Sequence, residues 1–158
     1  MSQTYTSANT SVNKGKLPRI YGLVYLDPEQ SVIDYGCGKY FDSYQLGDNI
    51  VGYDPYNRNN PELLNRNYDI ALCSNVLNVI MEREERIKIL ETLRDLANTT
   101  FITVYEGDKS RHGRVTKKDC YQLNWLRSDY IPELVEVFGF GNVKYNRKGY
   151  FECWSEVA

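Results

Sequence analysis

The hydrophobic pattern of the chain consists of short apolar runs and longer segments with helical spacing. Four short runs predict strands: residues 31–34, 50–53, 68–73 and 99–105. The third run holds Ile70, Ala71 and Leu72 in succession, which is typical of a strand covered on both faces. Because such strands occur in parallel sheets between helices, the pattern favours an α/β fold.

Two segments have the spacing of amphipathic helices. In residues 81–97, a helical face is formed by Ile87, Leu90, Leu93 or Arg94, and Ala97. Charged residues occupy the other faces of that segment. Residues 128–138 begin with the cap-like Ser128 and stop near Gly139, which predicts a second helix.

The two ends of the chain complete the predicted architecture. Residues 1–15 are rich in Ser, Thr and Asn, which predicts a flexible tail before a single domain at 16–158. The apolar, aromatic run 17–26 predicts a short helix or a lid segment on the sheet edge. Residues 143–145 and 150–154 flank a polar turn and predict an antiparallel hairpin. We therefore expect a mostly parallel, Rossmann-like sheet of about six strands, ending in this hairpin.

Composition and charge narrow the classes of function. With 19 Lys and Arg against 21 Asp and Glu, the net charge of −2 gives no global attraction to a polyanion or a membrane. No apolar stretch approaches the roughly 18 to 20 residues of a membrane span, and no secretory leader is expected. One histidine and four widely spaced cysteines argue against a zinc site and a disulfide framework. We expect a cytoplasmic protein with no metal and no membrane contact.

Two acidic residues follow predicted parallel strands. Asp34 begins the sequence Asp34-x-Gly36-x-Gly38, and Asp54 follows the next strand, 20 residues later. In an open α/β sheet, ligands bind at the edge where the parallel strands end. Glycines let the backbone approach a ligand, and a carboxylate accepts hydrogen bonds from both hydroxyls of a ribose. The pattern indicates a ligand that contains adenosine.

Two such ligands compete for this pattern. The dinucleotide motif has a third glycine that lets a helix approach a pyrophosphate, and Phe41 stands at that position here. Asp34 repels a pyrophosphate, whereas it attracts the ammonium and sulfonium groups of S-adenosylmethionine. S-adenosylmethionine is therefore favoured over NAD. The structural alternative is that Asp34 caps a turn and that Asp54 forms a turn with Pro55 and Asn57.

Three blocks of sequence resemble the class I S-adenosylmethionine-dependent methyltransferases. They are residues 32–38 (VIDYGCG), 52–55 (GYDP) and 74–80 (SNVLNVI). More narrowly, the chain is similar to methyltransferases associated with DNA phosphorothioation systems, which share these blocks and a leading segment like residues 15–18 (GKLP). The resemblance covers residues 15–152. It implies S-adenosylmethionine as the cofactor and leaves the methyl acceptor open.

The predicted cofactor site takes its residues from these blocks. They are Asp34, Tyr35, Gly36, Cys37, Gly38, Asp54, Pro55, Tyr56, Ser74 and Asn75. The chain departs from the class between residues 55 and 69, because this connection is too short for a crossover helix and a full strand. We therefore expect a reduced sheet without that strand and helix. Adenine recognition then rests on other residues, and the candidates are Tyr53, Tyr56 and Ser74.

Candidates for the acceptor side are Asn78, Arg111, Arg114 and Tyr121. Residues 109–118 contain five basic side chains and His112, which predicts either a phosphate-contacting surface for nucleic acid or a solvated loop. His112 is a candidate general base, although a lone histidine in an exposed loop is often idle. Asn75 and Asn78 have the alternative role of local turn-formers. Tyr121 either stacks on a planar substrate or packs in the core.

The sequence predicts an S-adenosylmethionine-dependent methyltransferase that acts on a nucleic acid or a small molecule. Cys120 lacks the Pro-Cys context of cytosine-C5 methyltransferases, and residues 74–77 do not match the Asp-Pro-Pro-Tyr motif of base N-methyltransferases. These two DNA-base chemistries are therefore disfavoured. One alternative is a non-catalytic protein that binds the cofactor and acts through a partner. Another is an enzyme that degrades the cofactor or uses NAD.

Overall fold

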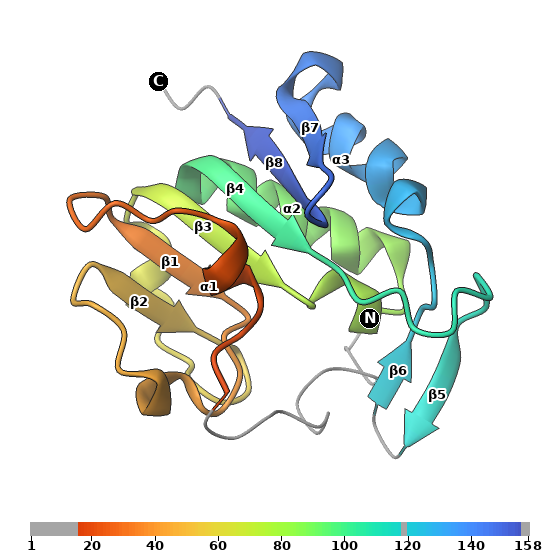
Figure 1. The fold of residues 1–158 in the computed structure, drawn as a ribbon, viewed down its shortest axis with the longest axis horizontal. Coiled ribbons are helices and arrows are strands. Elements are labelled where there is room, and N and C mark those ends of the chain that lie inside the picture. Colours follow the sequence, from red (N-terminus) through yellow and green to blue (C-terminus); the bar gives the residue numbers. More distant parts are fainter. Residues whose placement is uncertain (1–15, 118–119, 156–158) are drawn as a thin grey trace.

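A computed structural model describes residues 16–117 and 120–155, which form one central sheet with helices packed on it (Figure 1). The strands are β1 (Val32–Tyr35), β2 (Ile50–Tyr53), β3 (Tyr68–Ser74), β4 (Ala97–Thr103), β5 (Arg114–Lys117), β6 (Cys120–Gln122), β7 (Val143–Asn146) and β8 (Tyr150–Trp154). The α-helices are α1 (Ile20–Leu23), α2 (Arg83–Leu96) and α3 (Ile131–Phe138). The flexible tail expected at residues 1–15 lies outside the described residues.

The central sheet has six strands in the order β2-β1-β3-β4-β8-β7. The first four are parallel to one another, while β8 is antiparallel to both β4 and β7. The register places Asp34 of β1 between Gly52 of β2 and Leu72 of β3. The predicted mostly parallel sheet with a C-terminal antiparallel hairpin is confirmed.

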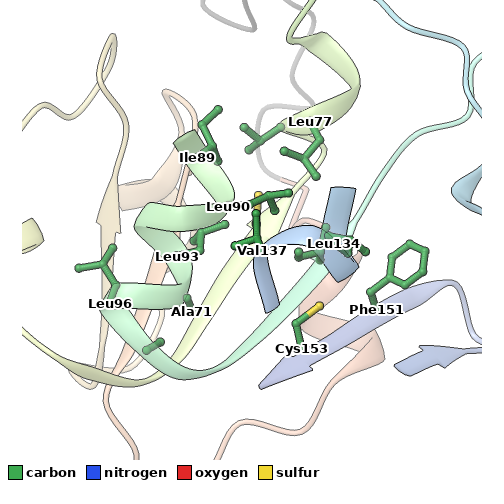
Figure 2. Close-up of a cluster of buried hydrophobic side chains, with 14 of the residues drawn as sticks. Ala71, Leu77, Ile89, Leu90, Leu93, Leu96, Leu134, Val137, Phe151 and Cys153 are labelled. Atoms are coloured by element: carbon green, nitrogen blue, oxygen red, sulfur yellow. The ribbon is translucent and has the colours of Figure 1, made fainter. Parts of the chain in front are cut away.

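The larger apolar core lies between one face of this sheet and the helices α2 and α3. Figure 2 shows part of it, with Leu90 and Leu93 of α2 and Val137 of α3 in the layer between helices and strands. Burial of each such side chain stabilises the fold by about 1.5–3 kcal/mol. The helix predicted over 81–97 is confirmed as α2, which begins two residues later and ends one residue earlier. Ala97 instead starts β4, where it pairs with Tyr68.

The opposite face of the sheet carries a smaller apolar cluster. Ile20 and Val24, in and just after α1, pack against Val32 of β1 and against Ile70 and Leu72 of β3. The short helix expected within residues 17–26 is therefore present, and it covers part of a sheet face rather than an edge. This placement brings the start of α1 close to the ends of the central strands (Figure 1).

The connection between β2 and β3 contains neither a full strand nor an α-helix. All of its residues are described, and they form a single bridge between Asp54 and Arg58 and a 3-10 turn, Pro61–Asn65. Leu63 of that turn is buried, and its carbonyl accepts a hydrogen bond from the Tyr68 hydroxyl at 2.7 Å. The prediction of a reduced sheet is confirmed.

A small antiparallel ribbon, β5–β6, was not predicted. β5 spans Arg114–Lys117, so these residues of the expected loop 109–118 form a strand, residues 109–113 do not, and residue 118 lies outside the described residues. Val115, the one apolar residue of β5, is exposed, so no apolar alternation marked this strand in the sequence. Next to the ribbon, the Leu123 amide after β6 donates a hydrogen bond of 2.8 Å to the carbonyl of Asn78, in the 3-10 turn that follows β3.

A buried ion pair joins α2 to α3. Both charged side chains are almost fully buried, with 3% of Arg86 and 5% of Glu133 exposed, and Nη2 of Arg86 lies 2.7 Å from Oε1 of Glu133. Nη1 of Arg86 donates to the carbonyls of Ile80 and Met81, and its guanidinium lies 4.8 Å from the ring centre of Trp125. Arg86 of α2 thus contacts three other segments of the chain: α3, residues 80–81 and Trp125.

All four cysteines of the chain are buried and free. Within residues 16–117 and 120–155, no group of three His, Cys, Asp or Glu side chains comes together as a metal site requires. None of the described helices is long and apolar enough to cross a membrane.

Candidate functional site

The turn after β1 is shaped by two glycines. Gly36 and Gly38 have φ values of 81° and 78°, a left-handed conformation that favours glycine. Gly36 also packs directly on Val76, because a Cβ at Gly36 would lie 2.5 Å from Cγ2 of that residue. The amides of Gly36 and Cys37 donate to the Tyr53 carbonyl at the end of β2. The turn therefore lies across the carboxyl edge of the sheet, where the parallel strands end.

Asp34 is a buried carboxylate beneath this turn. Only 2% of it is exposed, and it forms no ion pair within the described residues. Its Oδ2 accepts a hydrogen bond from the Tyr21 hydroxyl at 2.5 Å. Burial raises the pKa of Asp34 to about 6; the bond from Tyr21 opposes this rise, and the charge of Asp54 adds to it. A positively charged group next to Asp34 would stabilise the ionised form of this carboxyl.

Asp54, at the end of β2, lies next to the glycine turn. It is 3% exposed, and its Oδ2 accepts a hydrogen bond from the Gly38 amide at 3.0 Å. Its Oδ1 accepts bonds from the amides of Tyr56 and Asn57 and from the Asn57 side chain. The structural alternative considered for Asp54, a turn with Asn57, is therefore present. Oδ2 accepts one hydrogen bond within the described residues, against three at Oδ1, and so has a lone pair left for a ligand.

The segment after Gly38 contains no helix that could receive a pyrophosphate. Between Gly38 and Ile50, all within the described residues, the only helical segment is the 3-10 turn Phe41–Tyr44. Phe41 packs on the backbone of β2, because a Cβ at Gly52 would lie 2.7 Å from its ring. The guanidinium of Arg58 lies over that ring, with Cζ 5.2 Å from the ring centre. This arrangement lacks the helix N-terminus on which dinucleotide sites depend.

The remaining predicted cofactor residues lie around the same edge, in different environments. Tyr35 and Tyr53 pack ring to ring at 5.3 Å in the main core, which leaves Tyr56, 49% exposed, as the more accessible adenine candidate. Ser74 accepts a hydrogen bond from the Thr103 hydroxyl at 3.1 Å. Asn75 is exposed, adopts φ 57°, and its amide donates to the Thr103 carbonyl.

Cys37 and Pro55 complete the set of cofactor candidates. Burial, together with the charges of Asp34 and Asp54, raises the pKa of the Cys37 thiol, so the side chain is a neutral filler next to both acids. Pro55 is exposed in the turn that follows Asp54. Neither side chain contributes a charge to the site.

A hollow of about 370 Å³ opens beside the ends of β3 and β4. It is lined by Val79, Tyr105, Gly107, Asp108, Arg114, Thr116, Tyr121, Gln122 and Asn124. Its volume suits a compact ligand. Arg114 and Asp108 bring opposite charges to its wall, and the hydrogen bonds of Ser110 lower the pKa of the Asp108 carboxyl.

The acceptor-side candidates fall into two groups. Arg114 and Tyr121 line the hollow. Arg111 and His112 lie in the exposed loop, where Nε of Arg111 pairs with Asp129 at 3.0 Å. Asn78 is buried, and its Nδ2 donates to Oε1 of Gln122 at 3.1 Å. The backbone of His112 forms two hydrogen bonds in this loop. Its amide donates to the Ser110 hydroxyl, and its carbonyl accepts from the Asn124 side chain.

Tyr21 is the site residue that sequence reasoning missed. Burial and the charge of Asp34 raise the pKa of Tyr21, so its hydroxyl remains a protonated donor to that carboxylate. The sequence did indicate a lid in residues 17–26, but it could not show which side chain reaches Asp34. α1 therefore contributes directly to the site.

Comparisons with known proteins show the fold of the chain. No family model and no curated protein match it. A solved SAM-dependent methyltransferase from Methanosarcina mazei is similar at a TM-score of 0.61 and 10% identity, covering 90% of this chain and 99% of that one. An O-methyltransferase family protein from Burkholderia thailandensis gives 0.52 at 12% identity, over 82% and 52% of the two chains. The N-terminal domain of EvdMO1 with SAH bound gives 0.51 at 10% identity, over 85% and 84%. The chain therefore has a Rossmann-like methyltransferase fold.

Proposed function

We propose that this protein binds S-adenosylmethionine at the carboxyl edge of β1 and β2 and transfers its methyl group to an acceptor. The observation that carries the proposal is the pair of buried carboxylates, Asp34 and Asp54, under a glycine turn and without an ion-pair partner in the described chain. Buried charges are unfavourable unless something compensates them. A ligand with a ribose, an ammonium group and a sulfonium group supplies that compensation.

Each residue of the site is proposed to bind a different part of S-adenosylmethionine. Asp34 accepts the ammonium group, and the free lone pair of Asp54 Oδ2 accepts a ribose hydroxyl. Gly36 and Gly38 let the backbone of the turn approach the ligand. When bound, S-adenosylmethionine supplies an electrophilic methyl group, and the protein accelerates transfer by positioning the nucleophile in line with it.

The acceptor is proposed to enter from the hollow lined by Arg114 and Tyr121, because this hollow opens at the carboxyl edge, beside the ends of β3 and β4. A nucleic acid or a small molecule fits this proposal. The resemblance to methyltransferases of DNA phosphorothioation systems supports nucleic acid, a role in DNA modification and a cytoplasmic location. The ion pair between Arg111 and Asp129 reduces the free positive charge of the loop and supports a small acceptor.

Calorimetric titration tests the cofactor proposal. We expect binding of S-adenosylmethionine and S-adenosylhomocysteine and no binding of NAD, because the turn after Gly38 provides no pyrophosphate site. Binding of NAD alone would contradict the proposal. A radiolabelled methyl-transfer assay against DNA, RNA, protein and metabolite pools then separates a methyltransferase from a non-catalytic binder, and product analysis detects cofactor degradation.

Replacement of Asp54 by asparagine is expected to weaken S-adenosylhomocysteine binding roughly tenfold or more, as loss of a charge-assisted hydrogen bond predicts. Asparagine preserves the shape of the side chain, whereas alanine would also remove its four bonds to the turn. Asp48→Asn, at an exposed position before β2, is the matched control. Equal affinities of the two variants in a calorimetric titration would remove Asp54 from the ligand site.

The affinity is also expected to depend on pH. The pKa of Asp34 is about 6 in the free protein, so the carboxylate that attracts the ammonium group is lost as the pH falls through this value. S-adenosylhomocysteine affinity should therefore decline below pH 6. Tyr21→Phe removes a hydrogen bond that lowers this pKa, so the decline should begin at a higher pH. A titration series from pH 5 to 8 that shows the same midpoint for both proteins would contradict this role of Asp34.

A further inference from the structure

Four basic residues lie at or beside the turn between β7 and β8, at the carboxyl edge of the sheet. Arg147 and Lys148 lie in the turn between β7 and β8, Arg19 precedes α1, and Arg127 begins a 3-10 turn before α3. The β7–β8 turn is at this edge because β8 is antiparallel to β4 and starts where β4 ends. These residues therefore lie at the same edge of the sheet as the glycine turn.

Two of these guanidinium groups converge beside Gly149. A Cβ on Gly149 would lie 3.3 Å from Cζ of Arg127 and 3.4 Å from Nη2 of Arg19. Arg19 is held there by a hydrogen bond from Nη2 to the Lys148 carbonyl at 3.0 Å. Gly149 has φ 107°, a backbone conformation that favours glycine. Because glycine has no side chain, the space beside the two guanidinium groups is not filled.

Within the described residues, the positive charge at this point is only partly balanced. Glu106 is the one acidic partner, since its Oε1 lies 3.6 Å from Nη1 of Arg127 and its Oε2 accepts from the Arg127 amide. None of the ion pairs within the described residues includes Arg19, Arg147 or Lys148. Nε of Arg127 is buried without a hydrogen-bond partner, so the hydrogen bonding of this guanidinium is incomplete.

We propose that Arg19 and Arg127, converging beside Gly149, bind a phosphate group of the methyl acceptor. Two guanidinium groups repel each other unless an anion lies between them. The forked donors of arginine match the oxygens of a phosphate, and Arg147 and Lys148 extend the positive field around it. The assignment of this phosphate to the acceptor rests on the proposed methyltransferase function.

The position of the cluster separates it from the cofactor. Gly149 leads into β8, which is three strands from β1 in the sheet, a lateral distance of about 14 Å at the usual strand spacing. The carboxylate of the methionine moiety lies only two bonds from the ammonium group that Asp34 is proposed to bind. It therefore cannot reach Gly149. Arg127 instead contacts Glu106, whose neighbours Tyr105 and Gly107 line the hollow, so a phosphate on an acceptor in the hollow would lie near Arg127.

The test compares Arg19→Gln with the wild-type protein and with Arg66→Gln. Both arginines are exposed, but Arg66 lies at the amino end of β3, on the opposite edge of the sheet. Ribose 5-phosphate, ribose and a short DNA duplex are titrated into each protein at low salt. We expect Arg19→Gln to weaken binding of a phosphate-bearing probe about tenfold, Arg66→Gln to leave it unchanged, and ribose to bind to none of them.

The two phosphate probes distinguish the source of the phosphate. Arg19-dependent binding of ribose 5-phosphate supports a small phosphorylated acceptor. Arg19-dependent binding of the duplex alone, with a shallower salt dependence in Arg19→Gln, supports nucleic acid. Equal affinities in all three proteins, or no binding of either probe, would overturn the site.

A parallel titration with S-adenosylhomocysteine separates this proposal from the proposed function. We expect its affinity to be the same in all three proteins. An equal loss of S-adenosylhomocysteine and phosphate affinity in Arg19→Gln would overturn the proposal, because Arg19 would then serve the cofactor. If the wild-type protein binds phosphate but no S-adenosylhomocysteine, the phosphate site stands and the methyltransferase proposal fails.

Discussion

Replacing Asp34 with asparagine is expected to make the free protein more stable at pH 7.5, by about 1–3 kcal/mol. The pKa of Asp34 is about 6 in the folded protein and has its ordinary value of 3.8 in an unfolded chain. Between these values the folded protein holds a proton that the unfolded chain has lost, so stability falls as the pH rises through this window. Above pH 6 the full cost of the buried charge is present, and asparagine removes it.

The same substitution is expected to weaken S-adenosylhomocysteine binding about 10- to 100-fold, because the ammonium group loses its charged partner. Urea unfolding at pH 4 and 7.5 and calorimetric titration at pH 7.5 measure the two effects. Asp48→Asn is the matched control, since Asp48 is exposed and the chemical change is identical. A less stable Asp34→Asn variant at pH 7.5 would show that Asp34 serves the fold, as a turn cap does, and not a ligand.

The sheet could be predicted from the sequence because each of its strands has a local signal. Residues 70–73 are continuously apolar, and the hairpin at 143–154 surrounds a polar turn. The absent crossover between β2 and β3 followed from chain length alone, because a helix and a strand each need a minimum number of residues. These features depend on neighbouring residues and not on the packing of distant segments.

The β5–β6 ribbon could not be predicted, because its signal is not local. β5 carries charged and exposed side chains, and it pairs with β6 across a register shift between Val115 and Lys117. The ribbon is held instead by buried amides, since Gln122 accepts from Asn78 and donates to the Tyr105 carbonyl. Amide side chains have no hydrophobic periodicity, so nothing in the sequence marked them as structural.

The candidate site was predicted in position and only partly in detail. The strand ends and glycines located Asp34 and Asp54 at one edge, because parallel strands end together. The hydrogen bond from Tyr21 and the closed turn around Asp54 depend on how loops fold back, which the sequence pattern does not specify. The same holds for Arg19 and Arg127, which are 108 positions apart in the sequence and meet at Gly149.

The buried pair of Arg86 and Glu133 was also missed, because charged residues on a helix are normally solvated. A signal did exist in the spacing. Arg86 precedes Ile89, Leu90 and Leu93 by three, four and seven residues, which places it on the buried face of α2. Burial of an arginine in an apolar face is favourable only with complete partners, and this site provides them through a carboxylate, two carbonyls and an aromatic ring.

Removing one member of this pair is expected to destabilise the protein severely. Arg86→Met should lower the free energy of unfolding by about 3–5 kcal/mol, because it leaves the Glu133 carboxylate buried without a partner. Such a loss is a large share of the stability of a typical domain of this size. Urea unfolding followed by circular dichroism measures it.

The control is a second ion pair between the same two helices. Arg83 of α2 lies 2.9 Å from Glu136 of α3, but these side chains are 54% and 52% exposed. Arg83→Met should cost no more than about 1 kcal/mol, since water screens the pair and solvates the remaining carboxylate. The double variant Arg86→Met/Glu133→Leu should recover much of the loss, because neither buried charge remains. If the Arg86 and Arg83 variants were equally stable, or if the double variant were no better than Arg86→Met, the large effect could not come from an unpaired buried carboxylate.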